Sequence, residues 1–144
     1  MGKITGYSYV PQPFGIDPVT NKLVEIYRPV ISIRISKDHG QISPLFDALI
    51  DSGSDRNLFP LRFATALGIQ FKKIKPKQIG GIGKVIIDAY TEKINIWLGT
   101  KKYKTEADFS PQQQVPLLGR DGFFNLFKSI KFDEKGQFVY IEEG

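Results

Sequence analysis

The sequence predicts a mainly β protein, a barrel or a sandwich with one or two short helices. Three observations lead to this class. Short apolar segments, several of them with alternating polarity, follow one another closely along the chain. Turn signals rich in Gly, Pro, Asp and Asn separate them. The 144 residues are 41% hydrophobic, which is enough apolar material for one core and suggests one domain.

The elements are expected in the following order. Residues 1–28 are rich in Gly, Pro and Tyr and predict an extended arm that packs on the core of a domain spanning 29–144. Within that domain we expect strands at 29–36, 45–50, 72–77, 84–90, 94–98 and 101–109, short helices at 60–67 and 123–127, and a C-terminal hairpin at 130–142 that turns at Gly136. The first helix is favoured by a Pro at its first turn and a Gly after its end.

The composition removes several classes of function. Without cysteine there can be no disulfide, thiolate metal site or thiol nucleophile. The one histidine, His39 in an Asp-His-Gly turn, leaves little for a histidine metal site or a Ser-His-Asp triad. We therefore expect no metal and no cofactor, and chemistry done by carboxylates, hydroxyls, lysines or backbone amides. No apolar run approaches the ~20 residues that span a bilayer, so we expect no membrane segment and a cytoplasmic location.

The net charge of +5 is unevenly distributed. Residues 71–104 hold nine lysines against two acidic residues, a local charge of +7. Such a stretch can attract nucleic acid. It can equally consist of lysines that keep exposed strand edges from pairing with other chains. Because no arginine or aromatic stacking pattern accompanies the lysines, we favour the second interpretation and expect no nucleic-acid partner.

Three segments can carry chemistry. Leu49-Ile-Asp-Ser-Gly-Ser54 brings the Asp51 carboxylate to the end of an apolar strand, although Asp-Ser-Gly also forms ordinary β-turns. Gln78-Ile-Gly-Gly-Ile-Gly83 predicts a glycine-rich hairpin tip, and it lacks the third glycine and the following helix of a dinucleotide site. Leu117-Leu-Gly-Arg-Asp121 is a weak signal when taken alone.

The order of the three segments resembles the retropepsins, the homodimeric aspartic proteases of retroviruses and their cellular relatives. The first segment is similar to the catalytic Asp-Thr/Ser-Gly motif, the second to the flap tip, and the third to the Gly-Arg signature before the final helix. The resemblance covers about residues 29–130. It implies a closed acid-protease β-barrel with a flap hairpin at about 72–90.

The resemblance also implies the chemistry. Such enzymes hydrolyse peptide bonds with a water activated between two carboxylates that share one proton. This chain has one Asp-Ser-Gly, so a homodimer would supply the second Asp51. Ser52 would hydrogen-bond across the two-fold axis, and Gly53 would offer its carbonyl to the substrate.

The remaining roles are also implied by position. Asp55 and the flap amides of Gly80, Gly81 and Ile82 would contact the substrate. Ser54, Gly119 and Arg120 would support the site, and Arg120 would pair with Asp55. Leu58, Val115 and Leu117 are candidates for pocket walls or for core packing, and Arg56 and Lys84 could favour acidic side chains in the substrate.

The sequence leaves three questions open: the activity, the role of residues 1–28 and the contact made by Trp97. The leading hypothesis is a homodimeric aspartic endopeptidase acting on peptides or proteins. The alternative is a catalytically inactive dimer of the same fold that binds a peptide or protein. Residues 1–28 could be a propeptide, an autoinhibitory arm or a dimer element, and Trp97 could contact the arm or a second copy.

Overall fold

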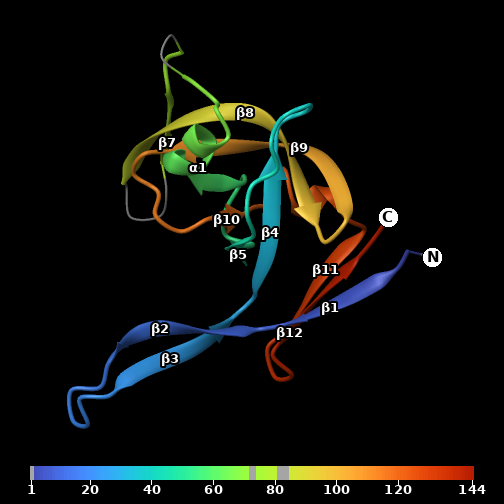
Figure 1. Ribbon diagram of the computed structural model, residues 1–144. Coiled ribbons are helices and arrows are strands. Elements are labelled where there is room, and N and C mark those ends of the chain that lie inside the picture. The colour runs from blue at the N-terminus through green and yellow to red at the C-terminus, as the bar shows by residue number, and fades with distance from the viewer. Residues whose placement is uncertain (1, 72–73, 81–84) are drawn as a thin grey trace.

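A closed barrel is the centre of the molecule in the computed structural model, which describes residues 2–71, 74–80 and 85–144. Its strands run in the order β4-β5-β10-β6-β9-β8, and pairing of β4 with β8 closes the ring (Figure 1). The bounds are β4 Val30–Ser36, β5 Phe46–Ile50, β6 Leu58–Pro60, β8 Ile86–Leu98, β9 Lys101–Ser110 and β10 Leu117–Leu118. The predicted mainly β barrel is confirmed.

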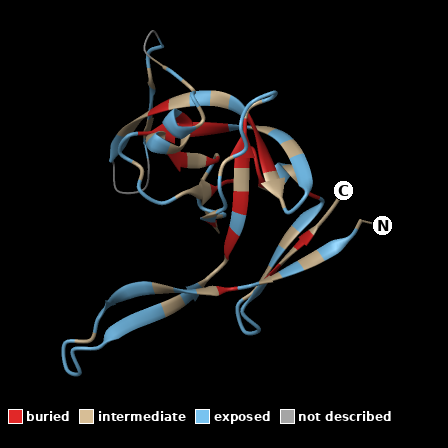
Figure 2. Cartoon of the chain, viewed as in Figure 1, coloured by how far each residue is buried: buried red, intermediate tan, exposed pale blue. Residues whose placement is uncertain are grey.

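The barrel is filled by side chains that alternate along its strands. Ile31, Ile33 and Ile35 of β4 are all buried, whereas the intervening Ser32 is exposed. This is the period-two pattern that predicted the strand. The same core receives Phe59 from β6 and Phe109 from β9, whose rings meet edge to face at 5.8 Å. Figure 2 shows the buried residues concentrated in the barrel.

Short helices lie beside the barrel where the sequence predicts them. Helix α1 spans Leu61–Ala66, with Pro60 before its first residue and Gly68 at a φ of +78° after its end. A 3-10 helix, η1, spans Phe124–Leu126 inside the range predicted for the second helix.

The strands next to the glycine-rich tip differ from the prediction. Strand β7 covers Lys77–Gly80, so Gln78 and Ile79 lie in a strand and not in a loop. It pairs antiparallel with β8, from Lys77 opposite Ala89 to Gly80 opposite Ile86. Strand β8 is continuous from Ile86 to Leu98, because its pairing with β7 up to Ala89 is followed directly by pairing with β9 from Tyr90, whereas the sequence indicated a break near Thr91.

The two ends of the chain meet in a second sheet. Strand β1 (Ile4–Ser8) pairs with β12 (Phe138–Glu142), which also pairs with β11 (Ser129–Asp133). Val139 and Ile141 of the central strand are buried against the barrel core. Tyr9 adds a further link, because its buried hydroxyl donates a 2.6 Å hydrogen bond to Glu134 and its pKa is raised to about 12 by burial and by that bond.

A two-stranded hairpin stands apart from both sheets. Strands β2 (Val10–Ile16) and β3 (Leu23–Arg28) pair only with each other, and the hairpin projects away from the barrel (Figure 1). Of the predicted arm, β1 packs on the rest of the domain through its pairing with β12. No residue of the described 10–28 segment joins the hydrophobic core. The boundary at residue 28 stays a prediction.

Candidate active site

The Asp51 turn is held at the end of β5 by backbone hydrogen bonds. Strand β5 runs parallel to β10, and the Asp51 N–H donates to the Leu118 carbonyl at 2.9 Å. The Ser54 N–H donates back to the Asp51 carbonyl at 3.1 Å, and the Gly53 N–H donates to Asp51 Oδ1 at 2.9 Å. A backbone amide therefore fixes the orientation of the partly buried carboxylate, while Ser52 and Gly53 stay exposed.

The loop after β10 locks against this turn. The Arg120 N–H donates to the Ser54 carbonyl at 2.9 Å, and the Asp121 N–H donates to the Asp55 carbonyl at 2.8 Å. Gly119 lies so close to the Arg56 backbone that an added Cβ would sit 2.2 Å from the Arg56 carbonyl oxygen. Glycine is required here by the close approach of the two segments.

Asn57 links its own segment, which follows the Asp51 turn, to the loop after β10, and it was not identified from the sequence. Its side chain is fully buried, accepts a 3.0 Å hydrogen bond from the Gly119 N–H and donates one of 3.0 Å to the Glu106 carbonyl. Both partners are more than 45 residues away in sequence, so no local pattern marks this asparagine. Its position directly before the apolar strand β6 is a weak signal at most, and only the fold shows that the amide is buried and needs partners.

Asp108 is a second residue that sequence reasoning missed. Its carboxylate is 1% exposed and lies 3.0 Å from Arg56 Nε and 3.0 Å from Lys77 Nζ, and it accepts a 2.6 Å hydrogen bond from the Thr91 hydroxyl. Burial by itself would raise the pKa of Asp108, but the hydrogen bonds from Thr91, Arg56 and Lys77 outweigh it and hold that pKa below its usual value. One buried carboxylate thus joins the segment after Asp51 to both flap strands.

Arg56 does not have the role expected for it. Its guanidinium contacts three carboxylates, those of Asp108, Asp121 (2.9 Å) and Glu106 (3.4 Å). It is therefore engaged within the chain, which does not fit the expected preference for acidic side chains of the substrate.

The expected pair of Arg120 and Asp55 is also not found: among the described residues no ion pair joins the two, and the Arg120 side chain is exposed. Trp97 likewise has a partner within the chain, since its indole N–H donates to the Ser36 hydroxyl at 2.9 Å.

A cavity of about 470 Å³ opens beside Asp51. The Asp51 segment and the flap strands form opposite walls, and its lining includes Asp51, Gly53, Ser54, Asp55, Leu58, Leu117, Ile79, Gly80 and Ile87. Arg56 also lines the cavity, so eight of the residues predicted for the site, its walls or the substrate preference meet here. Val115 lies at a different cleft, and Gly81, Ile82 and Lys84 fall outside the described residues.

A larger open groove of about 550 Å³ runs past Lys104 and Asn125, but it does not include Asp51. Its lining mixes acidic and basic side chains and contains none of the three sequence motifs as a whole. In the part of the chain that the structure describes, no three His, Asp or Glu side chains are grouped to hold a metal ion. The described helices include none with the length and apolar character of a membrane span.

The family model for the retroviral aspartyl protease matches residues 25–130, which is most of the chain and includes all three sequence motifs. The chain belongs to the retroviral aspartyl protease family. Comparison with curated protein sequences finds no match.

Solved structures of two family proteins are similar to the chain. A retropepsin-like aspartic protease from Rickettsia conorii is 12% identical, with a TM-score of 0.59 over 99% of this chain and 94% of that one. The protease of EIAV, solved with the inhibitor HBY-793, is 22% identical, with a TM-score of 0.51 over 65% of this chain and 82% of the other. These likenesses confirm the retropepsin-like fold.

Proposed function

We propose that the protein is an aspartic endopeptidase whose active site forms between two copies of the chain. The observation that carries the proposal is the Asp51 carboxylate, oriented by the Gly53 amide at the wall of a cavity of about 470 Å³. The family match supports hydrolysis of peptide bonds and does not favour an inactive peptide-binding dimer.

Two chains are needed because the chemistry uses two carboxylates. The described chain offers one Asp-Ser-Gly turn. Of the two other acids that line the cavity, Asp108 is paired with Arg56 and Lys77, and Asp55 is the residue proposed to contact the substrate backbone. A two-fold axis beside the turn would bring a second Asp51 to the first. Ser52 is exposed next to Asp51 and would hydrogen-bond across that axis.

In the proposed reaction the two Asp51 carboxylates hold one proton and one water, because two negative charges so close together are unfavourable. The unprotonated carboxylate takes a proton from the water as its oxygen attacks the scissile carbonyl carbon. The protonated one donates to the carbonyl oxygen. Collapse of the tetrahedral intermediate breaks the C–N bond, and a proton passes to the departing amine.

The substrate would lie extended between the walls of the cavity. The Gly53 carbonyl and Asp55 would contact its backbone from one side, and amides of Gly80, Gly81 and Ile82 from the flap side. Ser54, Gly119 and Arg120 would hold the Asp51 turn in place. The cytoplasmic location stays a prediction.

The test is cleavage of an unfolded protein by the purified chain, at acid and at neutral pH, with and without a pepstatin-class inhibitor. Inhibitor-sensitive cleavage is expected. Adding an equal amount of the Asp51→Asn variant to wild-type enzyme should then lower its activity to about half, because exchange places half of the wild-type chains in mixed dimers. Undiminished activity in the mixture would contradict a shared site.

A further inference from the structure

The β2–β3 hairpin exposes apolar side chains on both of its faces. Pairing of Ile16 with Leu23 and of Pro11 with Tyr27 places these residues on one face. Ile16 is 65% exposed and Leu23 60%. The opposite face carries Phe14, which is 65% exposed, and Val24. Between Val10 and Pro29 no described residue is buried, and Figure 2 shows this hairpin in pale blue and tan without red.

Such a hairpin lacks the packing that stabilises a two-stranded sheet. An isolated hairpin is marginal in water, and a contiguous exposed apolar surface marks a site of interaction. The remainder of the described chain covers neither face. A partner is needed to cover them.

The position of the hairpin indicates which partner. Pro29 directly follows β3, and its carbonyl accepts a 2.9 Å hydrogen bond from the N–H of Ile50, the residue before Asp51. The hairpin therefore leaves the barrel at the edge that carries the Asp51 turn and projects beyond it (Figure 1). A second copy that brings its own Asp51 to this turn must approach that same edge.

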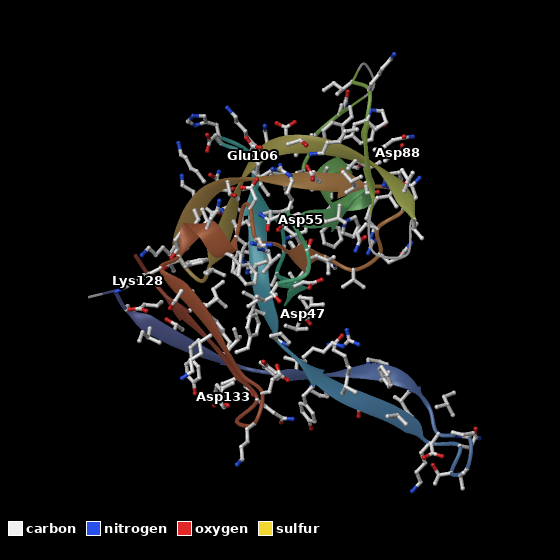
Figure 3. All side chains as sticks on the ribbon, turned by 180° about the vertical axis from the view of Figure 1, so that it is seen from behind. Asp47, Asp55, Asp88, Glu106, Lys128 and Asp133 are labelled. Carbon is white, nitrogen blue, oxygen red and sulfur yellow. The ribbon has the colours of Figure 1, made fainter. Side chains whose placement is uncertain are left out.

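The base of the hairpin also contains an unsatisfied donor. Arg28 lines a cleft of about 230 Å³ together with Gln12 and Asp47. Figure 3 shows Asp47 between Asp55 and the hairpin. Arg28 Nε is buried, and among the described residues it has no hydrogen-bond partner. Buried polar groups of this kind are normally paired, so the cleft is open to an acceptor from a docked chain.

We propose that the β2–β3 hairpin is a dimerisation arm that docks on a second copy of this chain. The proposal rests on the proposed function, which requires that second copy at the Asp51 edge. Two acidic residues (Asp17 and Glu25) and two basic ones (Lys22 and Arg28) balance the charge of the segment. An apolar arm without net charge suits self-association and lacks the basic character of a nucleic-acid or membrane contact.

The first test compares two matched double variants by sedimentation equilibrium. Ile16→Ser with Leu23→Ser removes an apolar pair from the arm. Ile42→Ser with Leu45→Ser removes the same two residue types, 49% and 56% exposed, from the connection at the opposite end of β4. The arm variant should raise the dimer dissociation constant at least tenfold, and the control should change it less than about twofold. An unchanged constant in the arm variant overturns the proposal.

The second test locates the arm directly. Val19 lies in the turn of the hairpin and is 91% exposed, and the chain has no cysteine of its own. A Val19→Cys variant carrying a benzophenone label is mixed with isotopically heavy unlabelled chain and irradiated. Cross-links between light and heavy peptides are expected. Cross-links confined to the labelled chain would mean that the arm folds back on its own body, and would overturn the proposal.

Failure of the arm and failure of the proposed function give different results. If the arm variant still forms a dimer and cleaves protein, the dimerisation role of the arm is disproved and the endopeptidase proposal stands. If dimerisation depends on the arm but the dimer never cleaves protein, the endopeptidase proposal is disproved and the dimerisation role of the arm stands. Thermal unfolding of each variant as a monomer establishes that it is folded, which the exposure of the replaced side chains leads us to expect.

Discussion

The two loops that follow β5 and β10 have the same place in the fold and opposite surroundings. Both follow parallel strands, and they exchange backbone hydrogen bonds from Arg120 to Ser54 and from Asp121 to Asp55. The first loop opens onto the cavity, with Asp51 at its wall. The second is closed, because Gly119 contacts the Arg56 backbone and the Asp121 carboxylate is paired with Arg56 at 2.9 Å.

The difference supports the proposal that each chain supplies one of the two catalytic carboxylates, while its second loop stabilises the first. A two-lobed arrangement with an acid in each loop would need Asp121 to face the cavity. Here Asp121 does not line it and is neutralised by an arginine. The asymmetry between equivalent loops is the structural reason for proposing a second copy.

The largest effect should come from removing the acid of the open loop. Asp51→Asn should lower peptide cleavage by roughly 10³-fold, because the general base or acid of the pair is lost. Asp121→Asn in the closed loop should change the rate by less than about fivefold, because its carboxylate contacts only structural partners. Initial rates on an unfolded protein substrate check both. Equal losses in the two variants would show that the loops are not functionally different.

The second largest effect concerns the glycines of the two loops. Gly119→Ala should lower the free energy of unfolding by about 3 kcal/mol, because its Cβ would overlap the Arg56 carbonyl and the loops would have to separate. In Gly53→Ala the nearest contact is Asp51 Oδ1 at 3.2 Å, so the cost should be below about 1 kcal/mol. Urea unfolding followed by tryptophan fluorescence measures both. A Gly119 variant as stable as the Gly53 variant would refute the account of the closed loop.

A smaller, pH-dependent effect is expected at Asp108. Asp108→Asn should cost about 2 kcal/mol at neutral pH, since it removes the charge that pairs with Arg56 and Lys77. The pKa of Asp108 is lowered in the folded chain, so the carboxylate stabilises it above the usual Asp pKa. That stability is lost as the pH falls through the folded-state pKa.

The free energies of unfolding of the wild type and of Asp108→Asn should accordingly become equal in acid. Glu106→Gln is the control, because its contact with Arg56 is longer, at 3.4 Å, and the side chain is 46% exposed. A cost for Asp108→Asn that does not change with pH would contradict the ionic explanation.

The smallest effect should be found at Arg120. Its exposed side chain has no ion pair among the described residues, so Arg120→Ala should change monomer stability by less than about 0.5 kcal/mol. Arg56→Ala should cost more, because it leaves Asp108 buried with fewer partners. If thermal unfolding ranks the two arginines in the opposite order, the ionic role belongs to the closed loop after all.

Features that depend on neighbouring residues alone, such as a strand or a turn, could be predicted from the sequence. The alternation of Ile31, Ile33 and Ile35 identifies a strand, and the Asp51 turn is visible because it follows an apolar run directly. The hairpin strands were not predicted because Pro11 and Pro13 interrupt the pattern. Both prolines are tolerated because β2 pairs on one edge only.

Long-range partners could not be predicted from the sequence. In the sequence, Asp108 is one acidic residue in a strand that contains both polar and apolar residues. Only the closed barrel places it beside Arg56, 52 residues earlier in the chain. Arg120 was preferred over Arg56 because of the Gly-Arg motif, but it is Arg56, in the other loop, whose guanidinium pairs with the carboxylates of Asp108, Asp121 and Glu106. These partners are 50 to 65 residues away from Arg56 in sequence, so no single segment contains the information.

The pairing of β1 with β12 has a consequence for how the chain reaches its fold. Ile4 lies opposite Glu142, so β1 cannot pair until β12, more than 130 residues later in the sequence, has been synthesised. Contacts so distant in sequence form late and slowly. During that interval β1 and the apolar hairpin beside it are open to other chains, which makes the early segment the place where aggregation would begin.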